Sequence, residues 1–446
     1  MEKNSDEITE EIQEEIPKKK KHGKVKFAVL SIVLAIVMFL AGAVTFWFVL
    51  DPGMRSLIKL KFMIDREYYE DIPDDEFYRV IFNAVNNDAL DAYSSYMTAD
   101  EYTSANSDLA GSRSGIGIVF QVLDEAGKQQ MLVIRVCGNS PAEEAGLKTG
   151  DRVIGFGKSE TELKDSASFD EFSKFLAERA DHEVFYLRVE NGGAERTVSL
   201  YKSEYTESSV FYRTSTTAYG FSGKNAGTLT EKGEPLTALD EQTAYIRLTQ
   251  FGNTAVREFD QVMSLFKEQG KKNLVLDLRG NGGGYMDVMQ GIAKYFCKTS
   301  TKKEPVAAVA DYGEKREKFK ATGNIYYEYF AEDSRICVLA DSSTASASEA
   351  LIGCMVDYGA TSYADICLSE RSGIAKTYGK GIMQTTYRVS LFKKDAVKLT
   401  TARVIWPVSD TCIHDRGILP EDGALTVAES YAGDTEITNA IEKLFS

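Results

Sequence analysis

Thr344-Ala345-Ser346-Ala347-Ser348-Glu349 is the stretch from which the fold of this chain can be worked out. The apolar run Ile336–Ala340 just before it predicts a buried strand, and the small residues after Ser346 predict the start of a helix. In the simplest interpretation Ser346 and Glu349 form a capping box for that helix. The same helix start offers free backbone N–H groups and the positive end of the helix dipole, which suit an oxyanion.

A lysine between two glycines, Gly379-Lys380-Gly381, follows further along the chain, with Gln384 just after it. A serine hydroxyl is a weak nucleophile until a base accepts its proton, and the chain has only 3 histidines. A lysine in a dry site can act as that base, because desolvation lowers its pKa. The two motifs together therefore favour a hydrolase of the Ser–Lys type, although the first motif alone is more typical of a helix cap and the second of a surface lysine.

The composition indicates a multidomain globular protein. The chain has 446 residues, of which 43% are hydrophobic and 27% charged, and this length allows about three domains. A net charge of −15 argues against nucleic acid as a partner. The cysteines show no zinc spacing, and most lie in apolar runs typical of buried thiols. Cys367 and Cys412 lie in polar surroundings, and their pairing stays open.

A run without charge, residues 27–50, is long enough to cross a bilayer. Lysines precede it, from Lys18 to Lys26, and Asp51 follows it, which predicts a cytoplasmic N-terminus and an ectodomain outside the cell membrane. A cleaved signal peptide is the alternative, since Ala41-Gly42-Ala43 resembles a cleavage site. The tail Met1–Pro17 is polar and acidic, which favours disorder.

The spacing of apolar residues changes along the predicted ectodomain. Helical spacing of apolar residues predicts helices over 54–98, and strand-like runs follow at Gly117–Val122, Met131–Cys137, Asp151–Phe156 and Val184–Val189. Between these runs lies a predicted short helix within Ser140–Asp151. The loop Gly115-Ile116-Gly117-Ile118 opens the first strand, where glycine N–H groups can face a peptide carboxylate and a peptide can add as an extra strand.

The remaining residues alternate predicted strands and helices, which indicates an α/β fold with parallel strands. The expected elements, in chain order, are a strand at Gln242–Phe251, a helix at Ala255–Gln269, a strand at Asn273–Leu278, a helix at Met286–Phe296, strands at Val306–Ala310 and Ile336–Ala340, and a C-terminal helix at Glu436–Leu444. Active sites in such folds lie at the carboxyl ends of strands. Both the glycine run Gly282–Gly284 and Ser346 fall at such ends, so this run predicts either a tight turn or an oxyanion-binding loop.

Taken together, these motifs resemble the carboxyl-terminal processing, or tail-specific, proteases of peptidase family S41 over nearly all of residues 55–446. The resemblance rests on these stretches: Tyr93–Met97, Asp277–Gly283, Thr344–Glu349, Tyr378–Gly381 with Gln384, Leu399–Arg403 and Gly417–Pro420, the last two resembling the closing strands of the family. It implies a helical subdomain (51–110), a PDZ domain (111–202) and an α/β, crotonase/ClpP-like protease core (203–446). The charge pattern around the apolar run separately predicts a cytoplasmic tail (1–26) and a transmembrane signal anchor (27–50) before them.

The resemblance also implies roles for single residues. Ser346 is the expected nucleophile, Lys380 the general base and Gln384 its supporting partner. The N–H groups of Ala347 and Gly283 are the expected oxyanion hole, although the run of three glycines leaves the choice of glycine open. The spacing from Ser346 to Lys380 is longer than the family usually shows, which keeps Lys376 as an alternative base.

The expected function is a membrane-anchored serine endopeptidase outside the cytoplasm that needs no metal or cofactor. Its PDZ domain, with Gly115–Ile118 as the peptide-binding loop, is expected to recognise protein substrates with apolar C-termini. A homodimer through 54–98 or Glu436–Leu444 is possible from the sequence. The alternative is an inactive protease-like scaffold that binds peptides, motivated by the extra residues near Thr361–Ala375.

Overall fold

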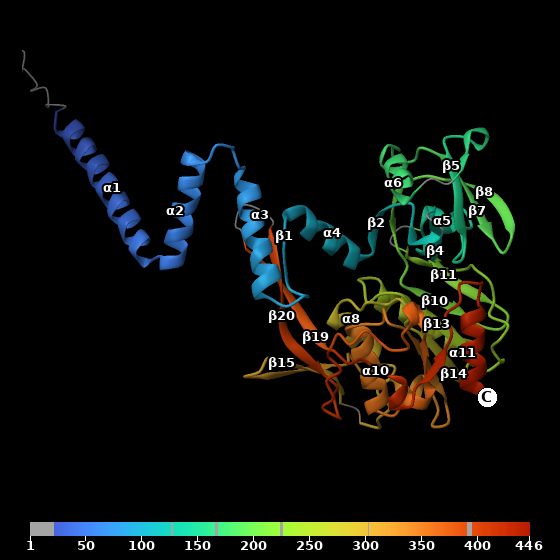
Figure 1. The fold of residues 1–446 in the computed structure, drawn as a ribbon. Coiled ribbons are helices and arrows are strands. Elements are labelled where there is room, and N and C mark those ends of the chain that lie inside the picture. Colours follow the sequence, from blue (N-terminus) through green and yellow to red (C-terminus); the bar gives the residue numbers. More distant parts are fainter. Residues whose placement is uncertain (1–21, 126–127, 166–167, 224–225, 302, 390–394) are drawn as a thin grey trace, which may run out of the picture. The chain divides into compact units, whose positions relative to one another are not determined.

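The computed structural model describes residues 22–125, 128–165, 168–223, 226–301, 303–389 and 395–446. Contacts divide the chain into two compact units, the first ending at Phe82 and the second running from Asn83 to Ser446 (Figure 1). The second unit holds all of the predicted site residues. The predicted tail Met1–Pro17 and the lysines at 18–21 lie outside the described residues.

The first unit begins with one long apolar helix, α1 (His22–Val49). Its segment Phe27–Val49 has a mean hydropathy of 2.8 over 23 residues, and the structure buries none of it. Helix α2 (Pro52–Glu67) starts where the Asp51 carboxylate accepts a hydrogen bond from the Gly53 N–H at 2.7 Å. By length and composition α1 could span a membrane or serve as a signal sequence.

The prediction of helix over 54–98 is confirmed for α2 and α3 (Asp74–Ala84) and wrong at its end. A five-residue π-helix covers Val85–Ala89, and the short strand β1 (Ser95–Met97) pairs antiparallel with β20 (Ala396–Ile405). The pairing with a strand far along the chain outweighs local helical preference here. Helix α4 (Ala99–Ala110), which lies within the predicted helical subdomain 51–110, follows a capping box of Thr98 and Glu101.

A six-stranded antiparallel sheet forms the β-rich part of the second unit and confirms the predicted strands and short helix. Its strand order is β3-β4-β5-β7-β8, and β6 pairs with β5. The elements are β2 (Ser112–Gly115), β3 (Ile118–Glu125), β4 (Lys128–Val136), α5 (Pro141–Glu144), β5 (Arg152–Gly157), a 3₁₀ turn (Glu160–Glu162), β6 (Lys164–Asp165), α6 (Phe169–Ala177), β7 (Phe185–Asn191), β8 (Ala194–Leu200) and β9 (Ser203–Thr206), which pairs with β2.

An eight-stranded mixed sheet, in the order β12-β11-β10-β13-β14-β17-β18-β21, carries the α/β part. The strands from β13 to β21 run parallel, as predicted, whereas β10, β11 and β12 pair antiparallel. The strands are β10 (Val210–Arg213), β11 (Ala218–Ser222), β12 (Thr228–Glu231), β13 (Thr243–Leu248), β14 (Asn273–Asp277), β17 (Ile336–Ala340), β18 (Ile366–Ser369) and β21 (Leu425–Val427). The parallel strands bring their carboxyl ends to one edge, where the glycine run and Ser346 follow β14 and β17.

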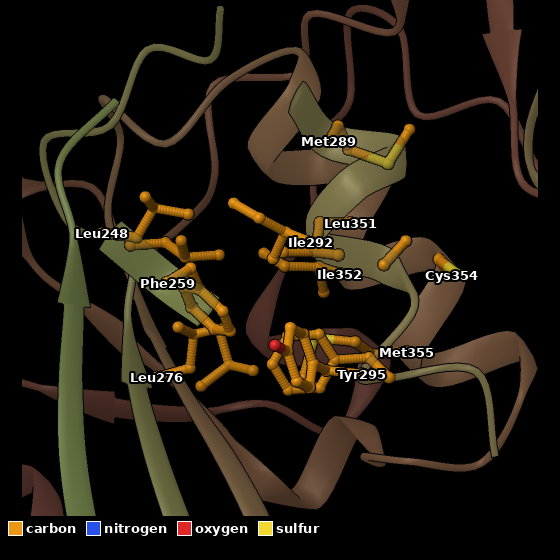
Figure 2. Packing of buried hydrophobic residues seen from close by; sticks show 14 of the residues in the cluster. Leu248, Phe259, Leu276, Met289, Ile292, Tyr295, Leu351, Ile352, Cys354 and Met355 are labelled. Atoms are coloured by element: carbon orange, nitrogen blue, oxygen red, sulfur yellow. The ribbon is translucent and has the colours of Figure 1, made fainter. Parts of the chain in front are cut away.

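Helices cover both faces of this sheet. On one face α7 (Ala255–Glu268), α8 (Met286–Ala293) and α10 (Ala347–Asp357) form the main core, in which Phe259, Ile292 and Leu351 meet Leu248 and Leu276 of the sheet (Figure 2). On the other face α11 (Thr435–Phe445) packs on alternate strand residues such as Val275 and Leu339. Because α11 buries its apolar side in this second core, that side is not available for the predicted dimer contact.

A further antiparallel sheet lies beside the parallel one and was not predicted as such. It joins β1, β20, β15 and β16, with β19 on β20, so the predicted strand Val306–Ala310 exists but stands outside the parallel sheet. Its other elements are β15 (Val306–Asp311), β16 (Arg316–Lys320) and β19 (Ile382–Arg388), and short helices lie at Tyr326–Tyr329, Tyr363–Asp365, Arg371–Gly373 and Pro420–Asp422. Leu399–Arg403 lies in β20, whereas Gly417–Pro420 is not a strand.

All six cysteines are free thiols, so Cys367 and Cys412 are unpaired. The inference that Cys367 has polar surroundings is wrong, because it is 1% exposed and packs in the second core under α11. Burial also raises the pKa of the Cys367 thiol to about 11.

Candidate active site

Ser346 stands at the sharp turn between β17 and α10. It occupies the N-cap position with φ 58° and ψ −115°, a conformation that non-glycine residues rarely adopt. Ala347 is the first residue of α10, and within the described chain its N–H has no hydrogen-bond acceptor, as expected for the first turn of a helix. The turn therefore presents a half-buried serine side chain beside an unused backbone donor.

The glycine loop after β14 lies directly against this turn. A Cβ atom on Gly283 would come within 2.9 Å of the Ser346 Cβ and 3.0 Å of the Ala347 nitrogen, and Gly283 has φ +99°. Only glycine fits here without displacing the serine. The Gly283 N–H donates to Asn281 Oδ1 at 2.9 Å, so this predicted oxyanion donor is already engaged in the structure.

Side chains tie the glycine loop to the serine turn. Buried Asp341 accepts from the Gly280 N–H at 3.0 Å and from the Ser343 N–H at 2.9 Å. The Ser348 hydroxyl donates to the Asn281 carbonyl at 3.0 Å. The two loops are thus fixed relative to each other by hydrogen bonds as well as by packing.

Lys380 lies on the loop that leads into β19 and is half-buried. Burial lowers the pKa of its ammonium group, and the charge of Lys398 lowers it further, while Glu349 and Asp91 act in the opposite direction. Its Nζ lies 5.6 Å from the centre of the Tyr93 ring. Between these two described residues, Ser346 and Lys380, no side-chain hydrogen bond is formed in this structure.

Glu349 links the serine turn to the lysine loop. Its Oε2 accepts from the Ser346 N–H at 3.0 Å and from the Lys380 N–H at 2.9 Å. Its Oε1 accepts from the Thr377 hydroxyl at 2.6 Å and from the Gly379 N–H at 2.8 Å. Burial raises the pKa of this carboxyl, and the four hydrogen bonds oppose that rise.

From the sequence, Glu349 is predicted only to cap the helix, and its contacts with residues 377–380 are not predicted. The spacing from Ser346 to Glu349 signals the cap. Nothing in the sequence shows that a loop 28–31 residues further on supplies the other donors.

Gln384 lies on β19, and its side-chain amide donates to the Tyr93 carbonyl. Within the described residues it forms no hydrogen bond with Lys380. The Tyr93 ring, from the segment before the β-rich region, lies edge-on to the Tyr378 ring at 6.4 Å and tilted against the His414 ring at 5.9 Å between ring centres. Burial raises the pKa of the Tyr93 hydroxyl to about 12.

The alternative base, Lys376, lies just before Thr377. In the described chain it makes no contact with the Glu349 carboxylate, whereas the Lys380 backbone does. The geometry around Glu349 therefore associates Lys380, rather than Lys376, with the serine turn.

The predicted peptide-binding loop joins β2 to the edge strand β3. Gly115 and Gly117 have φ +141° and +84°, and the Ser140 side chain lies where a Cβ on Gly117 would be. β3 pairs only with β4 in the described sheet, so its other edge carries unused backbone groups. The ring centres of Phe120 on β3 and Phe172 on α6 lie 5.7 Å apart. The surface between this edge and α6 is therefore apolar.

No group of His, Cys, Asp and Glu side chains that could hold a metal ion occurs among the described residues.

The α/β part of the chain is similar to a known protein family. Residues 242–422 match the model of peptidase family S41. The "Probable CtpA-like serine protease" of Staphylococcus aureus is 27% identical over 361 residues, which is 80% of this chain and 62% of that relative. The chain thus spans about 62% of the length of the curated relatives that it matches.

One solved structure shows a related fold. The crystal structure of a protein assigned as an S41 protease from Bacteroides fragilis is 16% identical with a TM-score of 0.51, and the match covers 84% of this chain and 90% of that one. The photosystem II D1 C-terminal processing protease is 23% identical with a TM-score of 0.45, over 83% and 86% of the two chains.

Proposed function

Residues 242–422 are a domain of peptidase family S41, and from this premise we propose that the chain is a serine endopeptidase with a Ser346–Lys380 dyad. The observation that carries the proposal is the Glu349 carboxylate, which binds the backbone of both residues and so brings a strained serine and a lysine with a lowered pKa to one place. A perturbed lysine beside a serine at a helix N-terminus is the arrangement that nucleophilic catalysis requires.

In the proposed mechanism, neutral Lys380 accepts the proton of Ser346 as its Oγ attacks the scissile carbonyl. The oxyanion accepts hydrogen bonds from the Ala347 N–H and from the glycine loop. Gly283 can supply the second donor only when its N–H leaves Asn281 Oδ1. The lysine returns its proton to the leaving amine, and a water molecule then releases the acyl group from Ser346.

We also propose that residues 111–202 form a PDZ domain that binds apolar substrate C-termini. Three features support the addition of a peptide as an extra strand. They are the open edge of β3, the glycine loop Gly115–Ile118 and the apolar surface between Phe120 and α6. Segment Phe27–Val49 would anchor the protein in the cell membrane with the N-terminus in the cytoplasm and the protease outside. Exposed apolar residues of α2, such as Ile58 and Phe62, would suit a homodimer.

The test is cleavage of an unfolded protein with an apolar C-terminus by the 446-residue chain in mild detergent. Cleavage by the parent and none by a folded Ser346→Ala variant is the expected result. Cleavage by both proteins would show that the nucleophile is another residue.

A second candidate function is an inactive scaffold that binds peptides. It is favoured by the absence, among the described residues, of a hydrogen bond between Ser346 and Lys380, and by the engagement of Gln384 with Tyr93. A fluorophosphonate probe separates the two candidates. Labelling of the parent but not of Ser346→Ala supports the protease, and no labelling in the presence of a PDZ peptide supports the scaffold.

A further inference from the structure

A cavity of about 430 Å³ opens beside the glycine loop, and its wall is unusually basic. Gly283 lines it and also packs against Ser346, so the cavity begins next to the proposed nucleophile. Arginines from four places in the chain reach its wall, and among the described residues that line it there is no carboxylate. They are Arg113, Arg135, Arg247 and Arg371. This contrasts with the net charge of −15 of the whole chain.

Three of these arginines pair with carboxylates that do not themselves line the cavity. Arg113 and Arg135 lie 3.0 and 3.1 Å from the Glu207 carboxylate. Arg371 lies 3.0 Å from Asp341. Their charges are therefore largely compensated within the protein.

Arg247 differs from the other three. It lies at the carboxyl end of β13 and is half-buried. Within the part of the chain that the structure describes it forms no ion pair, and its buried Nε atom has no hydrogen-bond partner. A buried guanidinium nitrogen without a partner is costly, so such a group usually has one in the functional complex.

The neighbouring carboxylate cannot easily serve as that partner. Arg247 stands opposite Asp277 in the parallel β13–β14 pair. Both oxygens of Asp277 are occupied, however, because Arg279 binds them at 2.9 and 2.6 Å and the Tyr245 hydroxyl donates at 2.6 Å. Asp277 thus attracts the charge of Arg247 without a hydrogen bond to it. The Arg247 guanidinium stays free to bind an anionic group in the cavity.

We propose that Arg247 binds a carboxylate of the substrate, so that this cavity is a specificity subsite for acidic peptide segments next to the scissile bond. The proposal rests on the proposed protease function. The carboxylate can come from a Glu or Asp side chain or from the C-terminus of a short substrate. Thr249 and Gln250, which also line the cavity, add polar groups around it.

The first experiment maps cleavage sites. The 446-residue chain in mild detergent digests a peptide library made from a denatured proteome, and mass spectrometry identifies the cleaved bonds. Asp and Glu should be enriched about tenfold at one position close to the scissile bond, the value for one charge-assisted hydrogen bond. Arg247→Gln should lose this enrichment while still cleaving neutral sites, and Arg247→Lys should keep part of it.

The matched control is Arg316→Gln, which removes a charge from β16 where Arg316 pairs with Asp311 and Asp410. It should leave the enrichment unchanged. An enrichment that is absent in the parent, or that survives in Arg247→Gln, would overturn the proposal. A purely structural role of Arg247 would lower cleavage of all sites equally and leave their ratio unchanged.

Synthetic peptides separate the two sources of carboxylate. A Glu/Gln pair at the enriched position tests the side chain, and a free acid/amide pair tests the C-terminus. Discrimination in either pair supports the subsite and names its ligand, whereas equal kcat/KM in both pairs contradicts it.

Binding measurements keep the subsite distinct from catalysis. If the parent cleaves nothing, the protease function fails, and calorimetry on the Ser346→Ala protein still tests the cavity with Ala/Ser/Val octapeptides that carry one Glu or Gln. About tenfold tighter binding of the Glu peptides, lost on adding Arg247→Gln, supports the subsite. Equal binding of Glu and Gln peptides refutes it.

Discussion

At the scale of single residues, Ser346 depends on the absence of a side chain opposite it. A Cβ atom on Gly283 would come within 2.8 Å of the Ala345 carbonyl oxygen and 2.9 Å of the Ser346 Cβ. Neither of these atoms can yield without moving the strained serine turn. The geometry of the proposed nucleophile is therefore set by the close approach of the Gly283 backbone to the serine turn.

Gly283→Ala should accordingly lose activity beyond its effect on stability. We expect a loss of about 1–3 kcal/mol in stability from the strained φ, and a fall of about a hundredfold in kcat as the serine turn is displaced. Thermal unfolding and cleavage kinetics measure the two effects.

The control is Gly270→Ala, because Gly270 has φ +63° with open space around its Cβ position. It should cost roughly 1–2 kcal/mol of stability and leave kcat unchanged. Equal kinetic effects of the two substitutions would show that strain alone, and not contact with Ser346, matters.

The proposed base can be tested through its charge environment. Since burial and the charge of Lys398 both lower the pKa of Lys380, kcat/KM should rise with pH through a pKa below the usual 10.5. Lys398→Gln removes one of these causes, so the pKa of Lys380 should increase and the rise should move to higher pH. Lys318→Gln, an exposed lysine on β16, should leave the pH profile in place. A profile unaffected by Lys398→Gln would argue against Lys380 as the titrating base.

At the scale of elements, one carboxylate holds α10 to the loop before β19. Four donors, from Ser346, Thr377, Gly379 and Lys380, converge on the two oxygens of Glu349. The cap of the nucleophile helix is therefore also the anchor of the lysine loop. The extra residues before Lys380 do not prevent this contact.

Glu349→Gln should uncouple the two elements with little change in volume. A neutral amide has one acceptor oxygen and cannot satisfy four donors, so at least one or two buried N–H groups lose their partners. We expect a loss of about 2–4 kcal/mol in stability and a large fall in kcat, while KM changes little. Denaturant unfolding and steady-state kinetics measure this. Glu328→Gln, at an exposed position of the helix Tyr326–Tyr329, should change neither quantity.

The sequence predicted some levels of this structure better than others. Elements with a clear apolar pattern, such as β14, α7 and α8, were predicted within a few residues, because burial against the rest of the core imposes that pattern locally. β1 was missed since its partner, β20, lies about three hundred residues away.

In the candidate site, too, local motifs could be predicted from the sequence and contacts between distant residues could not. The motifs around Ser346 and Lys380 are visible in the sequence, whereas the acceptor of the Gln384 amide is the carbonyl of Tyr93, 291 residues earlier. The isolated charge of Arg247 was invisible for a similar reason, because it results from Tyr245 and Arg279 occupying Asp277 first.

At the scale of the whole molecule, the fate of α1 would decide where the proposed protease works. The 23 residues Phe27–Val49 form a helix of about 35 Å, enough for a hydrocarbon core of about 30 Å, and the structure buries none of them. An apolar helix of this length that the structure leaves unburied suits either a lipid environment or removal as a signal sequence.

We expect the chain to remain in the membrane pellet after alkaline carbonate extraction, with its N-terminal residues intact by mass spectrometry. A variant that lacks residues 1–50 should appear in the supernatant, because nothing else in the described chain passes the criteria for a membrane span. A mature protein that begins close to Ala43 would instead identify this segment as a cleaved signal peptide. The proteolytic unit would then be released from the membrane, and its access to substrates would no longer depend on the bilayer.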